Sequence, residues 1–227
     1  MIEFLKSGGL VMIPLGLCSL IALAITVERL FNLRPSKILN RSMMKPVIEL
    51  AKAGKKEEAK ELLQDNPGIL STILLSALDN AGSDPEDLRQ TVLDTGRQQV
   101  PKLERYLPAL ATIAGIAPLL GLLGTVTGMI KVFNVVAAEE AGLTTGLASG
   151  ISIALITTAT GLTLAIPTLV IHQFLYARAD RILLGLERIA FAFLKELLKI
   201  SEKPEKDEDA FRVEPGRVLR AKVREKR

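Results

Sequence analysis

Three long apolar stretches constrain this chain more than any other feature. They cover residues 8–27, 107–130 and 147–175, and none of them contains an aspartate or a glutamate. A helix needs about 20 apolar residues to cross the hydrocarbon core of a bilayer, and each stretch meets that length. The sequence therefore predicts an all-α integral membrane protein with three transmembrane helices.

The first stretch could instead be a cleaved signal peptide or the anchor of a lipoprotein. Against cleavage, Glu28-Arg29 follows without a small-x-small site, and Leu17 stands before Cys18 where a lipoprotein needs a small residue. We therefore expect the stretch to remain as a membrane helix. Cys18 is the only cysteine, which excludes an intrachain disulfide, and we expect it to act as a small packing residue.

Basic residues predict how the chain is oriented. Apart from Lys6, Arg29 and Lys131, every Lys and Arg lies in 31–106 or 176–227. The positive-inside rule places those two segments in the cytoplasm, and the N-terminus and the 131–146 connection outside. The net charge of +4 is interpreted as a signal of topology rather than of nucleic-acid binding.

The cytoplasmic segments are predicted to be helical. We expect two short helices within 42–66 with Gly54 between them, a third over 69–80, and a fourth that begins at Asp84-Pro85 and continues through Arg105 into the second apolar stretch. Apolar residues at helical spacing extend the third membrane helix to about residue 200. The predicted division is 1–30 (N-terminal segment and first membrane helix), 31–106 (cytoplasmic), 107–137 (second membrane helix), 138–146 (outer hairpin), 147–175 (third membrane helix), 176–200 (cytoplasmic extension) and 201–227 (disordered charged tail).

Catalytic patterns are missing from the sequence. There is no Gly-rich loop followed by Lys-Ser/Thr, no Gly-x-Ser-x-Gly and no cluster of Cys and His. We expect neither enzymatic activity nor catalytic residues, metal or cofactor. The single histidine, His172, is expected at the membrane interface rather than in catalysis.

Small and hydroxyl residues fill the second and third stretches. Glycine, alanine and threonine recur every four residues, as in Gly121/Thr125 and Thr157/Gly161, which predicts close helix packing. The threonines can either bond carbonyls of their own helix or line a pathway for water or ions. Pro118 and Pro167 can free backbone carbonyls or merely kink the helices.

Two motifs carry a resemblance to a known family. They are Ala117-Pro118-Leu-Leu-Gly-Leu-Leu-Gly-Thr-Val-x-Gly-Met-Ile-x-x-Phe133 and Ala154-Leu-x-Thr-Thr-Ala-x-Gly-Leu-x-x-Ala-Ile-Pro167. Over about residues 8–200, the chain resembles the MotA/TolQ/ExbB proton-channel family, and its three predicted spans match the ExbB/TolQ branch better than the MotA branch.

The resemblance implies a homopentamer whose second and third helices surround a pore. The pore would hold the single membrane helices of two ExbD/TolR-like partners, which supply a proton-binding aspartate. The family's pore threonines correspond to Thr125 and Thr158, whereas Ile153 stands where the best-known relatives carry glutamate. The candidate ion-pathway residues are Thr125, Thr158 and Thr157. The candidates for helix packing and partner contact are Pro118, Gly121, Gly124, Gly128, Gly150, Ala154, Gly161 and Pro167.

The functional hypothesis is a proton-channel subunit of the bacterial inner membrane that drives an envelope protein such as TonB or TolA. A passive membrane scaffold and a flagellar or gliding-type stator subunit are the alternatives. A small-solute carrier is disfavoured because there is no inverted repeat and no charge within the membrane to bind a substrate. Because the spans contain no acid, the titrating carboxylate is expected on a partner chain.

Overall fold

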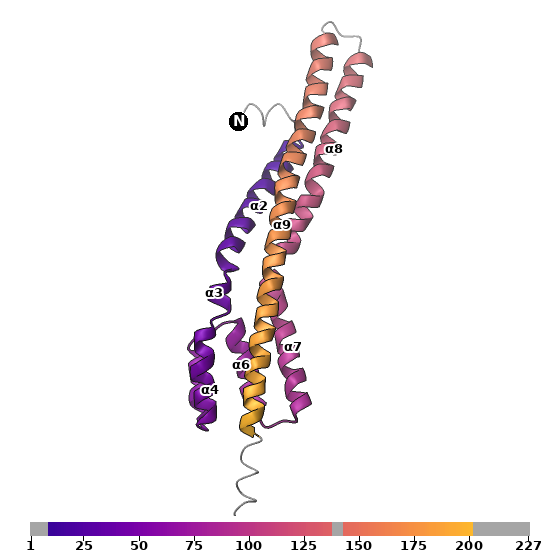
Figure 1. Cartoon of the computed structure of the whole chain (residues 1–227). Helices are drawn as coiled ribbons and strands as arrows, with labels where there is room; N and C mark the ends of the chain where they lie inside the picture. Colours follow the sequence, from indigo (N-terminus) through magenta and orange to yellow (C-terminus); the bar gives the residue numbers. More distant parts are fainter. Residues whose placement is uncertain (1–8, 138–142, 202–227) are drawn as a thin grey trace, which may run out of the picture. The chain divides into compact units, whose positions relative to one another are not determined.

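The computed structural model describes residues 9–137 and 143–201, and within them every regular element is helical (Figure 1). Three helices are long and apolar enough to cross a membrane: α2 (Met12–Asn32), α8 (Leu107–Ala137) and α9 (Leu143–Ser201). The predicted all-α class with three transmembrane helices is thereby confirmed. The N-terminal residues 1–8, most of the predicted outer hairpin (138–142) and the predicted tail beyond Ser201 lie outside the described residues.

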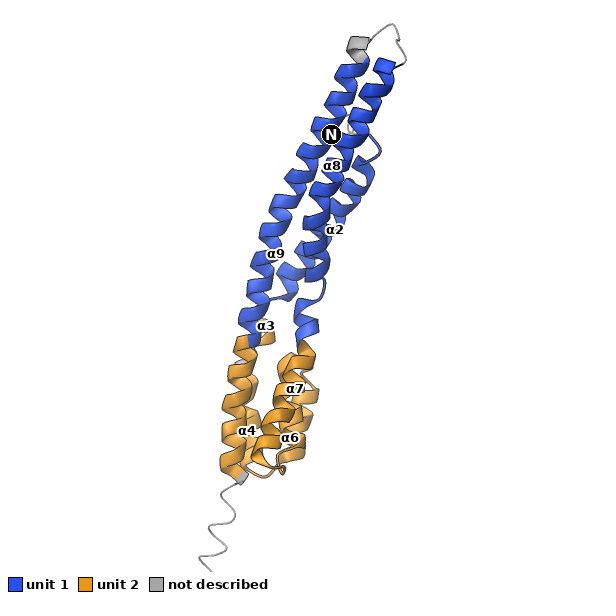
Figure 2. Cartoon of the chain, turned by 90° about the vertical axis from the view of Figure 1, so that its right-hand side faces the viewer, with its two compact units in different colours: residues 1–35, 100–183 blue, residues 36–99, 184–227 orange. Residues whose placement is uncertain are grey.

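The chain divides into two compact units (Figure 2). Unit 1 comprises residues 1–35 and 100–183, and unit 2 comprises 36–99 and 184–227. Helix α9 has 59 residues and belongs to both units. At 1.5 Å per residue it is about 90 Å long, roughly three times the thickness of a bilayer core. Only part of α9 can therefore lie in the membrane, and the predicted extension past residue 176 is confirmed.

In unit 1, α2 packs against α8 near the start of α2. Val11, Met12 and Leu15 are buried together with Ala117 of α8 and Ala165 of α9. Alanine at these two positions leaves room for the larger side chains of α2. The rest of α2 exposes leucine and isoleucine, as a helix that faces lipid does.

The second membrane helix does not continue from the helix that precedes it, and this corrects the prediction of one uninterrupted helix. Helix α7 (Pro85–Glu104) ends before Arg105, and α8 begins at Leu107. Between them Tyr106 has φ of +66°, which is the left-handed region. Pro108 disfavours a continuous helix here, because its ring would clash with the Glu104 carbonyl and it lacks the N–H that would bond that carbonyl.

Unit 2 is a small helical assembly around the end of α9. It contains α3 (Pro35–Ile38), the 3₁₀ turn η1 (Arg41–Met43), α4 (Met44–Lys52), α5 (Lys56–Gln64), α6 (Ile69–Asp79) and most of α7. The predicted apolar stripe of α9 is confirmed, since Leu186, Ile189 and Phe193 are buried. Val47, Ala59, Leu63, Leu74 and Leu88 complete the core from the shorter helices.

Two predicted helix boundaries in unit 2 have the expected capping geometry. The N–H of Glu86 donates to Oδ2 of Asp84, 3.1 Å away, immediately before Pro85 opens α7. At the end of α4, Gly54 has φ of +74°, and the N–H of Lys55 donates to the Leu50 carbonyl at 3.0 Å. This is the Schellman arrangement, which strongly favours glycine.

Replacing Gly54 with alanine is expected to lower the free energy of unfolding by about 1 kcal/mol, because an L-residue is strained at this positive φ. Thermal unfolding of unit 2 helices, followed by circular dichroism of the whole protein, measures the effect. Gly82→Ala is the matched control, since no atom lies within 4 Å of a Cβ at Gly82 and no positive φ is involved. Equal stability of the two variants would contradict the prediction.

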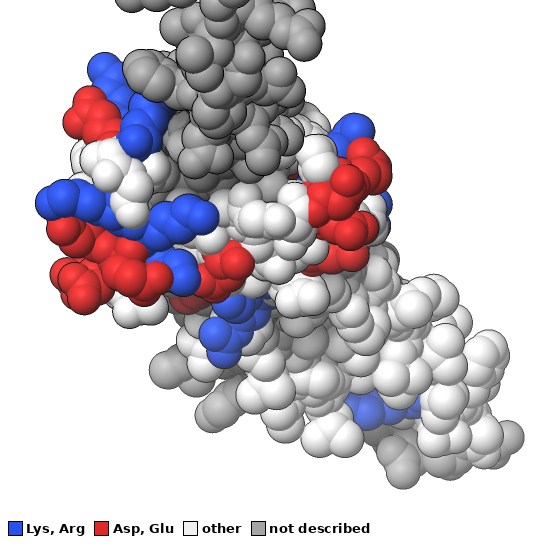
Figure 3. Space-filling view, turned by 90° about the horizontal axis from the view of Figure 1, so that it is seen from below, with Lys and Arg blue, Asp and Glu red and all other residues white. Residues whose placement is uncertain are grey.

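Charges on unit 2 are mixed in sign. In the view of Figure 3, Lys and Arg side chains lie beside Asp and Glu side chains. Lys60 is an example, because its ammonium lies 2.9 Å from Asp79 and 3.4 Å from Glu57. The hydrogen bond to Asp79 raises the pKa of Lys60. The basic excess of the sequence therefore does not appear here as a one-signed patch.

Candidate functional site

The site begins with the contact between α8 and α9, which is built on glycine. A Cβ at Gly161 would lie 2.6 Å from the Ala117 carbonyl oxygen and 3.1 Å from the Gly121 Cα. A Cβ at Gly124 would overlap the side chain of Thr157. The two backbones therefore approach as closely as the spacing of small residues predicts.

The same contact continues toward the other end of the two helices. A Cβ at Gly128 would lie 2.7 Å from the Gly150 carbonyl and 3.0 Å from the Ala154 Cβ, and one at Gly150 would lie 2.5 Å from Cγ2 of Val132. Later residues of α8 thus meet earlier residues of α9, and the helices are antiparallel. Gly121, Gly124, Gly128, Gly150, Ala154 and Gly161, all predicted to pack, meet in this one interface.

Thr158 makes the only described side-chain hydrogen bond between the two helices. Its Oγ1 donates to the carbonyl oxygen of Gly121 at 3.1 Å. That contact favours glycine at position 121, because a Cβ there would lie only 3.1 Å from the Thr158 Cα. Thr158 itself remains partly exposed.

The other two candidate threonines bond within their own helices. Thr157 is 0% exposed, and its Oγ1 lies 2.8 Å from the Ile153 carbonyl and 3.0 Å from the Ala154 carbonyl. Oγ1 of Thr125 donates to the Leu122 carbonyl at 2.6 Å, and the residue is half-buried. Within one chain, Thr157 packs between the helices. The assignment of all three to an ion pathway stays a prediction, because such a pathway would form between chains.

The predicted prolines both lie inside membrane helices. Pro118 of α8 is half-buried and Pro167 of α9 is exposed. Each lacks the N–H that would bond the carbonyl four residues earlier, so one backbone acceptor per helix is left for another donor.

Electrostatically, the α8–α9 contact carries almost no charge. Lys131 is the only ionisable residue of α8, and α9 has none from Leu143 until His172. Ile153 is half-buried, and its Cγ2 would lie 3.6 Å from a Cβ at Gly9. Among the described residues no group of three His, Cys, Asp or Glu side chains could hold a metal ion.

The single histidine and the single cysteine of the sequence do not take part in this contact. His172 stacks on Tyr176 with ring centroids 6.1 Å apart, and its Nδ1 is buried without a hydrogen-bond partner. Cys18 is half-buried and reduced.

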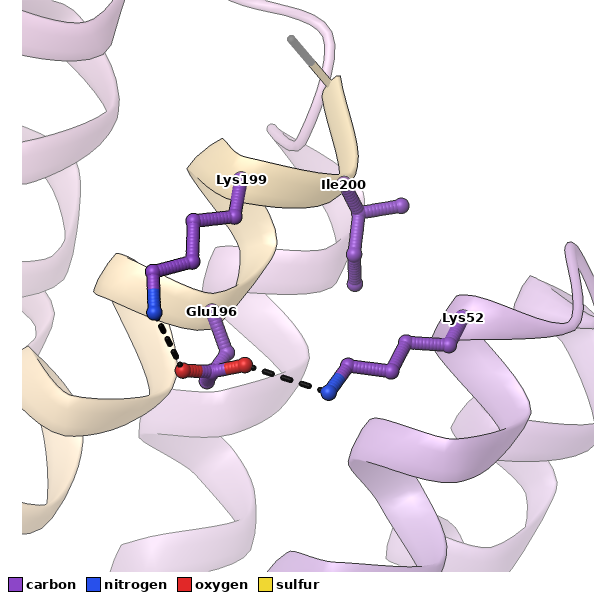
Figure 4. A pocket seen from close by; sticks show the side chains of 4 residues that line it. All are labelled: Lys52, Glu196, Lys199 and Ile200. Atoms are coloured by element: carbon purple, nitrogen blue, oxygen red, sulfur yellow. Dashed lines mark hydrogen bonds and ion pairs between the residues drawn. The ribbon is translucent and has the colours of Figure 1, made fainter. Parts of the chain in front are cut away.

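A surface pocket of unit 2 lies where α4 meets the end of α9 (Figure 4). Glu196 lies between two lysines, 3.2 Å from Nζ of Lys52 and 3.0 Å from Nζ of Lys199. Residue 196 is well beyond the apolar segment 147–175, and the hydrogen bonds from Lys199 and Lys52 lower the pKa of its carboxyl. Each charged group of the pocket has an ion-pair partner there. We therefore interpret the pocket as a structural ion-pair contact between α4 and α9.

One further residue, Arg29, entered the sequence analysis only as a topology marker. It is 5% exposed and donates from Nη1 to the carbonyls of Lys102 and Leu103, at 3.5 and 3.4 Å. Its guanidinium also pairs with Glu28 and lies 5.3 Å from the ring centre of Tyr106. Pro108 could have indicated the interruption of the helix, but no local pattern indicated that Arg29 lies against it.

Comparison with known proteins agrees with this architecture. The model of the MotA/TolQ/ExbB proton channel family matches residues 65–188. An ExbB-like biopolymer transport protein of Synechocystis sp. is 30% identical over 76% of this chain and 84% of its own length. A biopolymer transport protein ExbB of Vibrio cholerae is 32% identical over 79% of this chain and 80% of its own length.

A third relative comes from another transport system of the same family. The Tol-Pal system protein TolQ of Pseudomonas aeruginosa is 35% identical over 45% of this chain and 46% of its own length. The three apolar helices, together with these relatives, fit a multi-pass protein of the inner membrane. The family match covers α8 and the membrane part of α9, and the chain belongs to the MotA/TolQ/ExbB proton channel family, in its ExbB/TolQ branch.

Proposed function

We propose that this chain is the stator-like channel subunit of an inner-membrane motor that uses the proton motive force to do work on an envelope protein such as TonB or TolA. The observation that carries the proposal is the Thr158 hydroxyl, which bonds the Gly121 carbonyl between two acid-free helices. Membership of the family supplies the class of ion. We infer a channel subunit rather than an enzyme, without a cofactor.

The assembly proposed is a homopentamer around an ExbD/TolR-like partner with a single membrane helix. The exposed apolar side chains of α2, α8 and α9 provide surface for lipid and for other chains. Because the described membrane segments offer no carboxylate to bind a proton, the partner would contribute an aspartate. The N-terminus and the α8–α9 connection would face outward, and unit 2 would lie in the cytoplasm.

Neutral hydroxyls suit the task of the channel subunit. A hydroxyl can donate to a carboxylate or to relayed water and can also accept, while a fixed charge would hold the partner's aspartate in a buried ion pair that costs several kcal/mol to break. One proton that crosses a potential of 100 mV releases about 2.3 kcal/mol. The energy from a few protons per step would thus suffice to move the partner along the uncharged surface of the channel helices.

Reconstitution tests this division of labour. Proteoliposomes that contain only this chain are expected to conduct protons at the rate of empty liposomes, and addition of the partner should raise proton flux, read by a pH-sensitive dye inside the vesicles. Rapid proton flux through this chain alone would contradict the assignment of the proton-binding acid to the partner.

A passive scaffold would behave differently in cells. If the chain only positions a partner, its envelope process should continue after an uncoupler collapses the proton gradient while ATP is maintained by fermentation. Loss of the process under those conditions supports the motor, and undiminished activity supports the scaffold.

A further inference from the structure

The junction between α7 and α8 combines strain with a buried cation from a distant part of the sequence. Tyr106 is the only non-glycine residue with positive φ in the described part of the chain. Non-glycine residues persist in this region only where their surroundings fix them, and such residues gather at functional and switching positions. All groups of this junction belong to unit 1.

Every nitrogen of the Arg29 guanidinium has a partner, and Nη1 contacts the junction. Nη1 donates to the carbonyls of Lys102 and Leu103, Nε and Nη2 pair with Glu28, and the group lies over the Tyr106 ring. Glu28 is held in turn by Asn32, whose Nδ2 donates to it at 2.7 Å. A lysine could not make this set of contacts, because they need the planar fork of donors.

The two carbonyls that Arg29 contacts have an alternative use. In an uninterrupted helix, the Lys102 carbonyl would accept from the N–H of Tyr106, and the Leu103 carbonyl from the N–H of Leu107. Pro108 would kink such a helix, because it lacks its own N–H and its ring would clash with the Glu104 carbonyl, but the N–H groups of Tyr106 and Leu107 would still be free to make these two bonds. The junction therefore has two arrangements, and Arg29 stabilises the interrupted one.

We propose that Arg29 is a positioning residue, which holds the interruption at Tyr106 and thereby fixes how α8 enters the membrane. Without the guanidinium, Tyr106 leaves the left-handed region, and α7 continues into α8 through a proline kink. Because α8 carries Gly121 and Thr125, a change at its start alters the position of the candidate pathway. This last consequence rests on the proposed function.

Hydrogen exchange of the full chain in lipid nanodiscs tests the structural step. Arg29→Gln is expected to slow exchange of the Tyr106 and Leu107 amides by about tenfold, because both become bonded in a helix. The double variant Arg29→Gln/Tyr106→Gly should return the Leu107 amide to the wild-type rate, since glycine adopts positive φ without strain. Arg34→Gln is the control, because Arg34 is exposed and lies two residues past the end of α2, and it should leave the rates unchanged.

The outcomes separate positioning from a general loss of structure. Slower exchange in Arg29→Gln with reversal in the double variant supports the proposal. Unchanged or faster exchange in Arg29→Gln overturns it, as does a double variant that stays slow. A mere loosening of the fold would speed exchange, and glycine would not reverse it.

Output of the envelope process tests the functional step with the same variants. Arg29→Gln should reduce output by about tenfold and the double variant should restore it. Normal output in Arg29→Gln, with output lost in Thr158→Val, would overturn the positioning role and leave the proposed function intact. If the envelope process continues after an uncoupler collapses the proton gradient while exchange responds as expected, the proposed function is contradicted and the positioning role of Arg29 is retained.

Discussion

Replacing Gly161 with alanine is expected to force α9 away from α8 and to destabilise the protein by roughly 3 kcal/mol. The new Cβ would lie 2.6 Å from the Ala117 carbonyl oxygen and 3.1 Å from the Gly121 Cα. Both obstacles are backbone atoms, so no change of rotamer relieves the overlap. Separation of the helices would also lengthen the bond from Thr158 to the Gly121 carbonyl.

Unfolding of the purified protein in mixed detergent and SDS micelles measures the effect of Gly161→Ala. Gly115→Ala is the matched control, because Gly115 also lies inside a membrane helix, α8, and no atom is within 4 Å of its Cβ position. The control should unfold at the SDS fraction of the wild type or slightly above it, since alanine favours helix over glycine. Indistinguishable unfolding of the two variants would show that the α8–α9 contact differs from the one described.

The glycine pattern shows how much of this fold could be predicted from sequence. Small residues every four positions predicted a close helix contact, and Gly124, Gly128 and Gly150 lie in it. The length of the apolar stretches and their lack of acids predicted the three membrane spans. Both features are needed because polar groups are costly in lipid, and this requirement applies to each membrane helix by itself. Such local requirements are visible along the chain.

Side-chain direction around a helix was less predictable. Thr157 and Thr158 are neighbours and were both proposed to line a pathway, yet Thr157 is fully buried against Gly124 while Thr158 bonds across to Gly121. Adjacent helical residues point about 100° apart, and only the position of α8 decides which of them meets it. The pattern of hydroxyl residues in the sequence does not show where α8 lies relative to α9.

The junction at Tyr106 shows a second reason why part of the structure could not be predicted from the sequence. Pro108 could have indicated an interruption, but Arg29 and its acceptor Leu103 are separated by 74 residues. Nothing in the local sequence shows that a buried guanidinium will reach the end of α7. Contacts between distant segments depend on how α2 packs in unit 1, and therefore on the tertiary structure.

Replacing Thr158 with valine is expected to abolish the output of the motor while leaving the assembly intact. Valine has nearly the shape of threonine, so the packing against Gly121 is kept and only the hydroxyl is lost. The missing hydrogen bond between membrane helices costs about 1 kcal/mol, too little to unfold the chain. Without the hydroxyl, however, neither a protonated carboxyl nor a relayed water finds an acceptor oxygen at this position, and output should fall by about tenfold or more.

The measurement compares the envelope process in cells that express wild type or Thr158→Val at equal levels, with assembly checked by size-exclusion chromatography of the solubilised complex. Thr112→Val is the matched control, because the Thr112 hydroxyl donates to the Pro108 carbonyl of its own helix at 2.9 Å and faces outward. That variant should keep full output. Full output in Thr158→Val would remove Thr158 from the pathway, and loss of output in both variants would show that hydroxyls serve the fold of α8 and α9 rather than the passage of protons.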